Sequence, residues 1–195
     1  MSARILVLPG SVRTGSLNAL LAAEAARRLA LTSASVTLLS LADYPLPLLD
    51  ADLEASDGLP ENAVKLAERI AAQDALLLVS PEYNASLPPL LKNAVDWVSR
   101  VTRIGGRPVQ PFRRLIVGFA AASPRPGGGA RSLAAWRLVF QDLGADLLTP
   151  QCTVGEAGTA FDESGRLSSE RANLALDTLV ETLVGQASAL GRHGF

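Results

Sequence analysis

Short apolar runs alternate with helix-like segments along this 195-residue chain, and this alternation constrains the fold more than any other feature. The run from Ala75 to Val79 is apolar at every position, which is typical of a strand buried on both faces of a parallel sheet. After the first such run, Leu17, Leu21 and Ala25 recur at helical spacing. Five strands are predicted, each followed by a helix, at residues 4–8, 35–41, 75–79, 115–122 and 146–154.

A chain of alternating strands and helices folds into a parallel sheet with helices on both faces and right-handed crossovers. Of the two common doubly wound strand orders, 2-1-3-4-5 fits five strands, whereas the dinucleotide-binding order needs six. We therefore expect an α/β, flavodoxin-like three-layer sandwich with a five-stranded parallel sheet, formed by a single domain over residues 1–195. In this order a crevice opens beyond the carboxyl ends of the first and third strands.

Charge and cysteine content narrow the classes of partner. The formal net charge is −1, and no cluster of Lys and Arg offers a footprint for nucleic acid or an anionic membrane. Cys152 is the only cysteine, so no intrachain disulfide forms, and a buried thiol in a reducing compartment is expected. The first apolar run, Ile5 to Leu8, is too short for a signal peptide. We expect a soluble cytoplasmic protein with small-molecule partners.

The stretch from Gly10 to Asn18 has the composition of a phosphate-binding loop. It joins the first predicted strand to a helix whose first N–H groups lack intrahelical acceptors. Arg13 adds a fixed positive charge, and Gly10 and Gly15 let the backbone approach a ligand. Hydroxyl groups come from Ser11, Thr14 and Ser16. The competing interpretation is a polar strand-to-helix turn in which Ser16 is only the N-cap.

Several other phosphate sites are excluded by single residues. Ser16 stands where a Walker A motif needs lysine, which argues against an NTPase. No G-x-G-x-x-G occurs, and Asp43 lies too far along the chain after the second strand for the ribose-binding role. A cysteine phosphatase would need arginine at position 158, which is Gly158. His193 is predicted to be a solvated tail residue, and no metal-ligand cluster is recognisable. A terminal phosphate monoester such as that of FMN remains.

Two further segments bear on assembly. Asp43 to Asp50 contains two prolines and is predicted to be a long apolar loop. The helix that follows the third strand carries a second apolar stripe of Leu90, Trp97 and Val101. This stripe is expected to face another subunit, and the alternative is an unusually wide core face covered by loops.

Two loops together resemble the NADPH-dependent FMN reductase family. Residues 10–18 resemble its G-S-x-R-x-x-S-x-N signature, and residues 80–97 its P-E-Y-N-x-S-x-P-x-x-L-K-N-A-x-D-W run. The order of elements agrees over essentially the whole chain, and the likeness is greatest to the quinone- and chromate-reducing branch. Ser123 and the residues 128–131, Gly-Gly-Ala-Arg, match a third loop of the family.

The resemblance implies an FMN site formed by these loops. Ser11, Arg13, Ser16 and Asn18 would hold the phosphate end of FMN, with Leu17 beside them. Pro81, Glu82, Tyr83 and Asn84 would border the isoalloxazine, with Ser123 in the third loop and Tyr83 near a subunit interface. No side chain is expected to serve as an essential acid or base, because the flavin carries the chemistry.

The resemblance also implies a homodimer or homotetramer that passes hydride from NADPH or NADH through FMN to quinones, chromate or azo compounds in a ping-pong cycle. The alternatives are a free-FMN reductase that supplies a monooxygenase and a flavodoxin-like electron carrier. Two departures from the family pattern occur. Pro89 replaces the usual glycine, which the first turn of a helix tolerates, and Pro124-Arg125-Pro126 stiffens the third loop and adds a charge near the ring.

Overall fold

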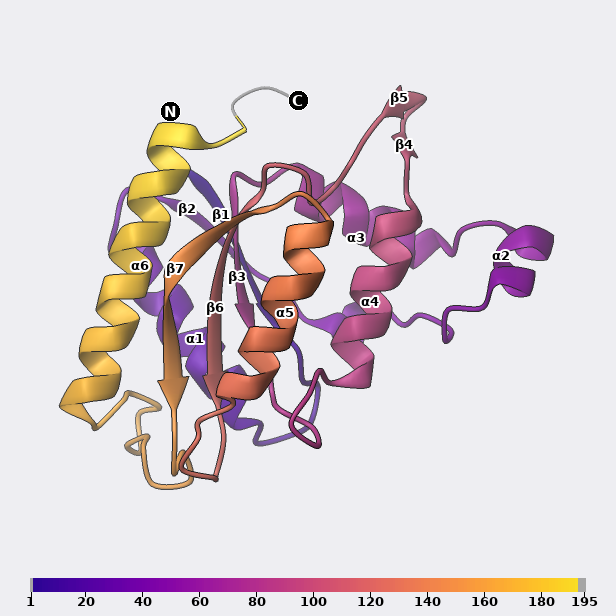
Figure 1. The fold of residues 1–195 in the computed structure, drawn as a ribbon. Coiled ribbons are helices and arrows are strands. Elements are labelled where there is room, and N and C mark those ends of the chain that lie inside the picture. Colours follow the sequence, from indigo (N-terminus) through magenta and orange to yellow (C-terminus); the bar gives the residue numbers. More distant parts are fainter. Residues whose placement is uncertain (1, 193–195) are drawn as a thin grey trace.

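Five parallel strands form the central sheet of the computed structural model, which describes residues 2–192 (Figure 1). The sheet order is β2-β1-β3-β6-β7, so the predicted order 2-1-3-4-5 is confirmed for the five sheet strands. His193 lies outside the described residues. The strands are β1 (Arg4–Pro9), β2 (Ser35–Leu38), β3 (Ala75–Val79), β6 (Ile116–Ala122) and β7 (Asp146–Val154).

Helices cover both faces of this sheet because the side chains of each buried strand alternate between two cores. In β1, Ile5 and Val7 pack into one core, whereas Leu6 and Leu8 pack into the other. The first core lies under α1 (Leu17–Ala30) and α6 (Glu170–Leu190). The second lies under α3 (Glu61–Ala71), α4 (Pro89–Arg100) and α5 (Ala130–Asp142). The result is the three-layer arrangement that the sequence predicts.

The second apolar stripe of the helix after β3, which is α4, was expected to face another subunit. The structure corrects this expectation. Trp97 and Val101 are fully buried, and of this stripe only Leu90 is exposed. The indole N–H of Trp97 donates to the carbonyl of Pro47 at 2.8 Å, so the proline-containing loop lies over this part of the helix. Asn93 also donates to Pro47 at 2.8 Å. The alternative interpretation, an unusually wide core face covered by loops, is therefore correct for Trp97 and Val101 but not for Leu90.

Several segments differ from the sequence prediction. The second strand ends at Leu38 rather than at residue 41, and Leu41–Asp43 form a 3-10 helix capped by Ser40. Helix α2 (Ala51–Asp57) has no buried residue, so it gives no apolar periodicity to detect. A small hairpin pairs β4 (Arg103–Ile104) with β5 (Arg107–Pro108). Figure 1 shows α2 and this hairpin projecting from the body of the molecule.

Charged side chains tie the chain together at the amino ends of the strands. Asp74, immediately before β3, accepts from the main-chain N–H of Arg4 and from its guanidinium, both at 2.9 Å. The Arg192 guanidinium donates to the carbonyls of Ile70 and Pro111, each at 2.9 Å, and burial lowers the pKa of Arg192 to about 10. We call Arg4, Asp74 and Arg192 the amino-edge clamp.

Candidate active site

The candidate site lies at the opposite edge, where the loops after β1, β3 and β6 meet beyond the carboxyl ends of the strands. A hollow of about 140 Å³ lies between these loops, and it brings together every site residue predicted above except Asn84. Parallel strands place these loops together because all five strands end at one edge of the sheet. The lining residues are Ser11, Arg13, Ser16, Leu17, Asn18, Pro81, Glu82, Tyr83, Ala122, Ser123 and Pro124.

The first loop is held in shape by close backbone packing. Gly10 donates its N–H to the carbonyl of Val79 at 2.8 Å, and a Cβ at this position would lie 2.6 Å from Cδ2 of Leu91. Only glycine therefore allows β1 and α4 to approach so closely. Gly15 adopts a positive φ of 68° in the turn before the helix. These contacts fix the backbone of the loop against β3 and α4.

Ser16 is the N-cap of α1, as the simpler interpretation of the loop proposed. Its hydroxyl oxygen accepts from the N–H of Ala19 at 3.3 Å. The N–H groups of Leu17 and Asn18 belong to the first turn, where a helix offers no intrahelical acceptor. Because Ser16 also lines the hollow, the cap and the phosphate-binding role are compatible.

Arg13 carries the positive charge of the hollow. Its guanidinium donates only to the carbonyls of its neighbours Thr14, at 3.4 Å, and Gly15, at 3.2 Å. Among residues 2–192 no carboxylate forms an ion pair with it. An exposed guanidinium in the loop that leads into α1, without a counter-ion among the described residues, is suited to an anionic group.

Asn18 has a structural role that sequence reasoning missed. The side chain is buried, and its amide exchanges two hydrogen bonds with the main chain of Ala122, both at 2.9 Å. This pair fixes the start of α1 to the end of β6. The side chain of Asn18 therefore positions the loops around the hollow, and its main-chain N–H is the group that a ligand at the helix N-terminus would meet.

The second loop is a tight turn, and this explains why Asn84 lies outside the hollow. Tyr83 and Ser86 exchange two main-chain hydrogen bonds, at 3.1 and 2.9 Å. Asn84 and Ala85 between them both have positive φ, at 49° and 62°, as the two central residues of a type I′ turn do. Asn84 therefore occupies the exposed tip, and Tyr83 is left 51% exposed at the rim of the hollow.

Glu82 is turned toward α5. One carboxylate oxygen accepts from the main-chain N–H of Arg131 at 3.0 Å and of Ser132 at 3.4 Å. The N-cap residue of α5 is Gly129, which has no side chain to cap the helix, so the carboxylate of Glu82 supplies the missing acceptor. This residue links the second and third loops.

A buried hydroxyl network supports the second loop from beneath. The indole N–H of Trp136 donates to Ser80 Oγ at 2.7 Å, and Ser80 Oγ lies 3.1 Å from Ser132 Oγ. Ser132 Oγ in turn donates to the carbonyl of Pro81 at 3.0 Å. Sequence reasoning missed this network, because Ser80 follows β3 whereas Ser132 and Trp136 lie on α5, and only the fold brings the two segments together.

The third loop is tied to the end of β7. Ser123 donates its N–H to Val154 at 2.9 Å, and its hydroxyl accepts from the N–H of Arg125 at 3.2 Å. A Cβ on Gly155 would lie 2.3 Å from the carbonyl oxygen of Pro126, so glycine is required where the two segments touch. The rigidity expected from the two prolines is thus reinforced by contacts to a neighbouring strand.

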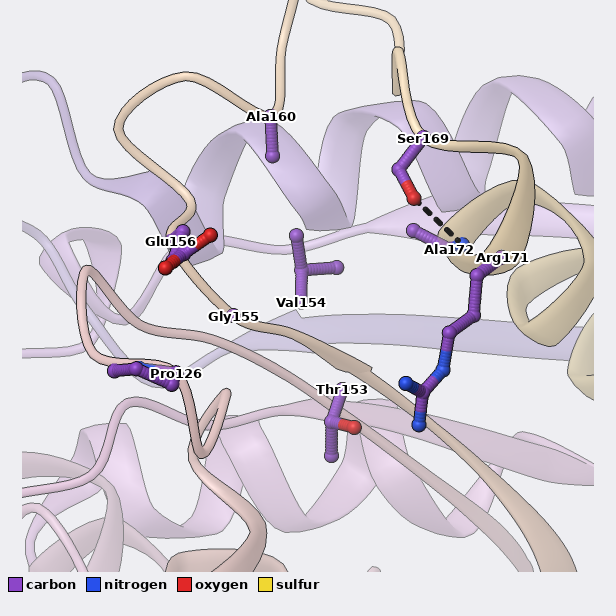
Figure 2. A pocket seen from close by; sticks show the side chains of 9 residues that line it. All are labelled: Pro126, Thr153, Val154, Gly155, Glu156, Ala160, Ser169, Arg171 and Ala172. Atoms are coloured by element: carbon purple, nitrogen blue, oxygen red, sulfur yellow. Dashed lines mark hydrogen bonds between the residues drawn. The ribbon is translucent and has the colours of Figure 1, made fainter.

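A second hollow of about 290 Å³ lies on the other side of this contact (Figure 2). Figure 2 shows Arg171, from the start of α6, extending toward Thr153, with Glu156 across the hollow from them. None of the predicted site residues lines it, and Arg125 lines neither hollow. It is separate from the candidate site.

The described residues give no support for a reactive thiol or a metal centre. Cys152 is buried, and burial raises the pKa of its thiol to about 12, so the expectation of an inert core thiol is confirmed. Residues 2–192 contain no group of His, Cys, Asp and Glu side chains arranged to hold a metal ion. No helix in this part of the chain is long and apolar enough to span a membrane.

The strand order defines a flavodoxin-like fold, and the hollow lies at the carboxyl ends of β1, β3 and β6, where such folds bind their ligands. The sequence profile of the NADPH-dependent FMN reductases matches residues 3–159, and the chain belongs to that family. It is therefore a flavin-dependent oxidoreductase that uses FMN and a reduced nicotinamide cofactor.

Individual relatives agree with this assignment. The chain is 35% identical over 183 residues to an NAD(P)H-dependent FMN reductase of Pseudomonas aeruginosa, covering 92% of each chain. It is 39% identical over 142 residues to a quinone reductase of Escherichia coli, covering 71% of each. Among solved structures, the flavoenzyme NAD(P)H:(acceptor) oxidoreductase FerB of Paracoccus denitrificans aligns with a TM-score of 0.79 and 27% identity, covering 97% of this chain and 99% of that one.

Proposed function

We propose that this protein transfers hydride from NADPH or NADH through bound FMN to quinones and related acceptors such as chromate and azo compounds, in a ping-pong mechanism. The observation that carries the proposal is the meeting of three loops around one hollow, with the unpaired guanidinium of Arg13 at its phosphate-binding end. The quinone reductase relatives support the choice of acceptor class.

The proposed phosphate site consists of Ser11, Arg13, Ser16, Leu17 and Asn18. This donor set fits a phosphate monoester because it combines a charged fork, hydroxyl groups and the free N–H groups of a helix N-terminus. Asn18 also holds α1 against β6, so this set is attached to the sheet. A site built on a fixed strand and helix loses little conformational entropy when it binds.

The proposed ring site consists of Pro81, Glu82, Tyr83, Asn84 and Ser123. The type I′ turn and the carboxylate of Glu82 fix the main chain of this loop, whose polar groups would face the edge of the flavin. The hollow of about 140 Å³ is smaller than the ligand pockets typical of drug-sized molecules. The ring is therefore expected to extend beyond it, toward the exposed Tyr83.

Bound FMN would supply the hydride acceptor and donor, so the protein needs to bind, position and shield rather than to transfer protons. We assign no side chain as an essential acid or base. In the proposed ping-pong cycle the nicotinamide and the acceptor use the same opening in turn, and the stiff third loop around Pro124 limits the shape of that opening.

We also propose that residues 1–195 form one FMN-binding domain and that it assembles as a homodimer or homotetramer. Three exposed apolar side chains support assembly at the start of α4: Leu48 is 79% exposed, Tyr83 51% and Leu90 42%. Leu48 lies between Pro47 and Leu49, whose main chains both hydrogen-bond to the side chain of Asn93. Asn93 follows Leu90 by about one turn of α4. A second copy of this chain would cover them.

The test begins with purified protein titrated with FMN, NADH or NADPH and a benzoquinone. We expect a bound flavin spectrum, oxidation of the nicotinamide without a partner reductase, and parallel lines in double-reciprocal plots. Retention of FMN through gel filtration would argue against a free-FMN reductase, and turnover without a partner would argue against an electron carrier. Protein that binds no FMN, or that fails to oxidise either nicotinamide, would refute the proposal.

A further inference from the structure

The second hollow, of about 290 Å³, lies beside the candidate site, and the proposed binding of FMN does not use it. The third loop separates the two spaces: Pro124 lines the candidate site, and Pro126 lines the second hollow. Two residues further along a chain, the Cα atom lies at most about 7 Å away. A ligand that lies beside FMN in the candidate site therefore needs to cross only this loop to enter the second hollow.

Main-chain hydrogen bonds hold the wall between the two hollows in place. The N–H of Glu156 donates to the carbonyl of Arg125 at 3.3 Å, and the N–H of Ala157 donates to the carbonyl of Ser123 at 3.0 Å. These bonds tie the third loop to the segment that follows β7. The shape of the second hollow is therefore set by the fold, as is usual for small-molecule sites.

Two charged side chains line the second hollow from opposite sides. Figure 2 shows Arg171 extending toward Thr153, with Glu156 across the hollow. Among residues 2–192 neither the Arg171 guanidinium nor the Glu156 carboxylate forms an ion pair. The space between them suits a ligand that carries an anionic group at one end and a hydrogen-bond donor at the other.

Arg125 lies between the two prolines of the third loop and is exposed. It lines neither hollow, and its guanidinium forms no ion pair in the part of the chain that the structure describes. An exposed cation between two sites attracts the anionic linker of a ligand that occupies both.

We propose that the second hollow binds the adenosine 2′-phosphate end of NADPH while the nicotinamide lies in the candidate site. Arg171 binds the 2′-phosphate, and Glu156 accepts a hydrogen bond from the adenine amino group. Arg125 meets the diphosphate where the cofactor crosses the third loop. This inference rests on the proposed function. The phosphate of FMN keeps its own site at Arg13, so the two cofactors use different arginines and can be bound together.

This arrangement predicts a preference for NADPH over NADH. In NADH a hydroxyl replaces the 2′-phosphate, which leaves the Arg171 guanidinium without an anionic partner. The diphosphate is common to both cofactors. Arg171 therefore sets the preference between the two cofactors, whereas Arg125 contributes equally to the binding of both.

Steady-state kinetics with a benzoquinone test the two roles. In the wild type kcat/KM should be higher for NADPH than for NADH. Arg171→Ala should lower the ratio of the two values about tenfold, through the KM for NADPH. Arg125→Ala should lower both values about threefold, because its exposed charge is screened, and leave their ratio within about twofold of the wild type. The matched control is Arg107→Ala, at an exposed position on the β4–β5 hairpin, which should behave as the wild type does.

Calorimetry tests the hollow itself, with adenosine 2′-monophosphate, adenosine 5′-monophosphate and inorganic phosphate as probes. The 2′-monophosphate should bind about tenfold more tightly than either other probe, and Arg171→Ala should abolish the difference. Glu156 has a positive φ of 49°, so Glu156→Gly removes the carboxylate without straining the backbone. This variant should weaken binding of the 2′-monophosphate but not of inorganic phosphate.

An unchanged cofactor ratio in Arg171→Ala, an equal fall of that ratio in Arg107→Ala, a wild type that prefers NADH, or equal binding of the three probes would overturn the proposal. Failure of the proposed function is seen separately, as absence of bound FMN or of nicotinamide oxidation in the wild type. Titration with adenosine 2′-monophosphate still reports on the second hollow in that event, because it requires neither flavin nor turnover.

Discussion

The two edges of the sheet use arginine in opposite ways. At the amino edge Arg4 is paired with the buried carboxylate of Asp74, and Arg192 donates to carbonyls that it cross-links. At the carboxyl edge Arg13 meets only the carbonyls of its own loop. A charge whose partners are all in the protein stabilises the fold, whereas a charge held without a counter-ion is available to a ligand.

The largest expected effect is at the amino-edge clamp. Asp74→Ala removes a fully buried carboxylate that accepts from both the main-chain N–H and the guanidinium of Arg4. We expect the free energy of unfolding to fall by about 3 kcal/mol. Urea unfolding measures this change, and the affinity of the folded variant for FMN should equal that of the wild type. A large loss of FMN affinity in the folded variant would contradict the claim that the amino edge stabilises the fold and only the carboxyl edge binds the ligand.

Arg13→Ala should show the opposite pattern. Its guanidinium makes no ion pair with any of the described residues, so stability should stay within about 0.5 kcal/mol of the wild type. The loss of a charged hydrogen-bonding partner should weaken FMN binding by about 2 kcal/mol, or roughly thirtyfold. Quenching of FMN fluorescence reports the affinity. Unchanged affinity would remove Arg13 from the phosphate site.

Ser16→Ala combines the two patterns because Ser16 both caps α1 and lines the hollow. We expect a loss of stability of about 1 kcal/mol from the missing cap, together with weaker FMN binding. Ser16→Asp is the control: it restores the cap but places a negative charge beside the phosphate. Recovery of stability without recovery of FMN affinity would separate the roles, and recovery of both would show that the cap alone matters.

The smallest effect is expected at Arg131. Its guanidinium lies 3.7 Å from the Glu82 carboxylate and is largely exposed, whereas the bond from its main-chain N–H to Glu82 survives substitution. Arg131→Ala should therefore change stability by less than about 0.5 kcal/mol. Glu82→Ala, which removes the acceptor for the start of α5, should cost about 1 kcal/mol. Equal effects of the two changes in thermal unfolding would contradict this assignment.

The strands and helices of the central sheet were predictable from the sequence because each gives its own pattern of apolar residues. The apolar alternation gave the strand order, and the strand order gave the three loops around one hollow. Helix α2 escaped prediction because it buries no residue and so shows no apolar periodicity. A covering contact such as that of Pro47 on Trp97 joins segments fifty residues apart, and no periodicity encodes it.

The roles of single side chains were less predictable, because they depend on partners from other elements. Asn18 belongs to a motif for phosphate binding, yet its amide is used by Ala122 of β6. Asn84 falls outside the hollow because a two-residue turn gives it a positive φ.

The thermal stabilisation produced by FMN tests the difference between the two edges most directly. The midpoint of unfolding, with and without saturating FMN, should be measured for the wild type, Arg13→Ala and Arg4→Ala. We predict that Arg4→Ala unfolds at a lower temperature but is stabilised by FMN as much as the wild type is. Arg13→Ala should match the wild type without FMN and gain much less from it. The reverse pattern, with Arg13→Ala unstable and fully responsive to FMN, would contradict the account.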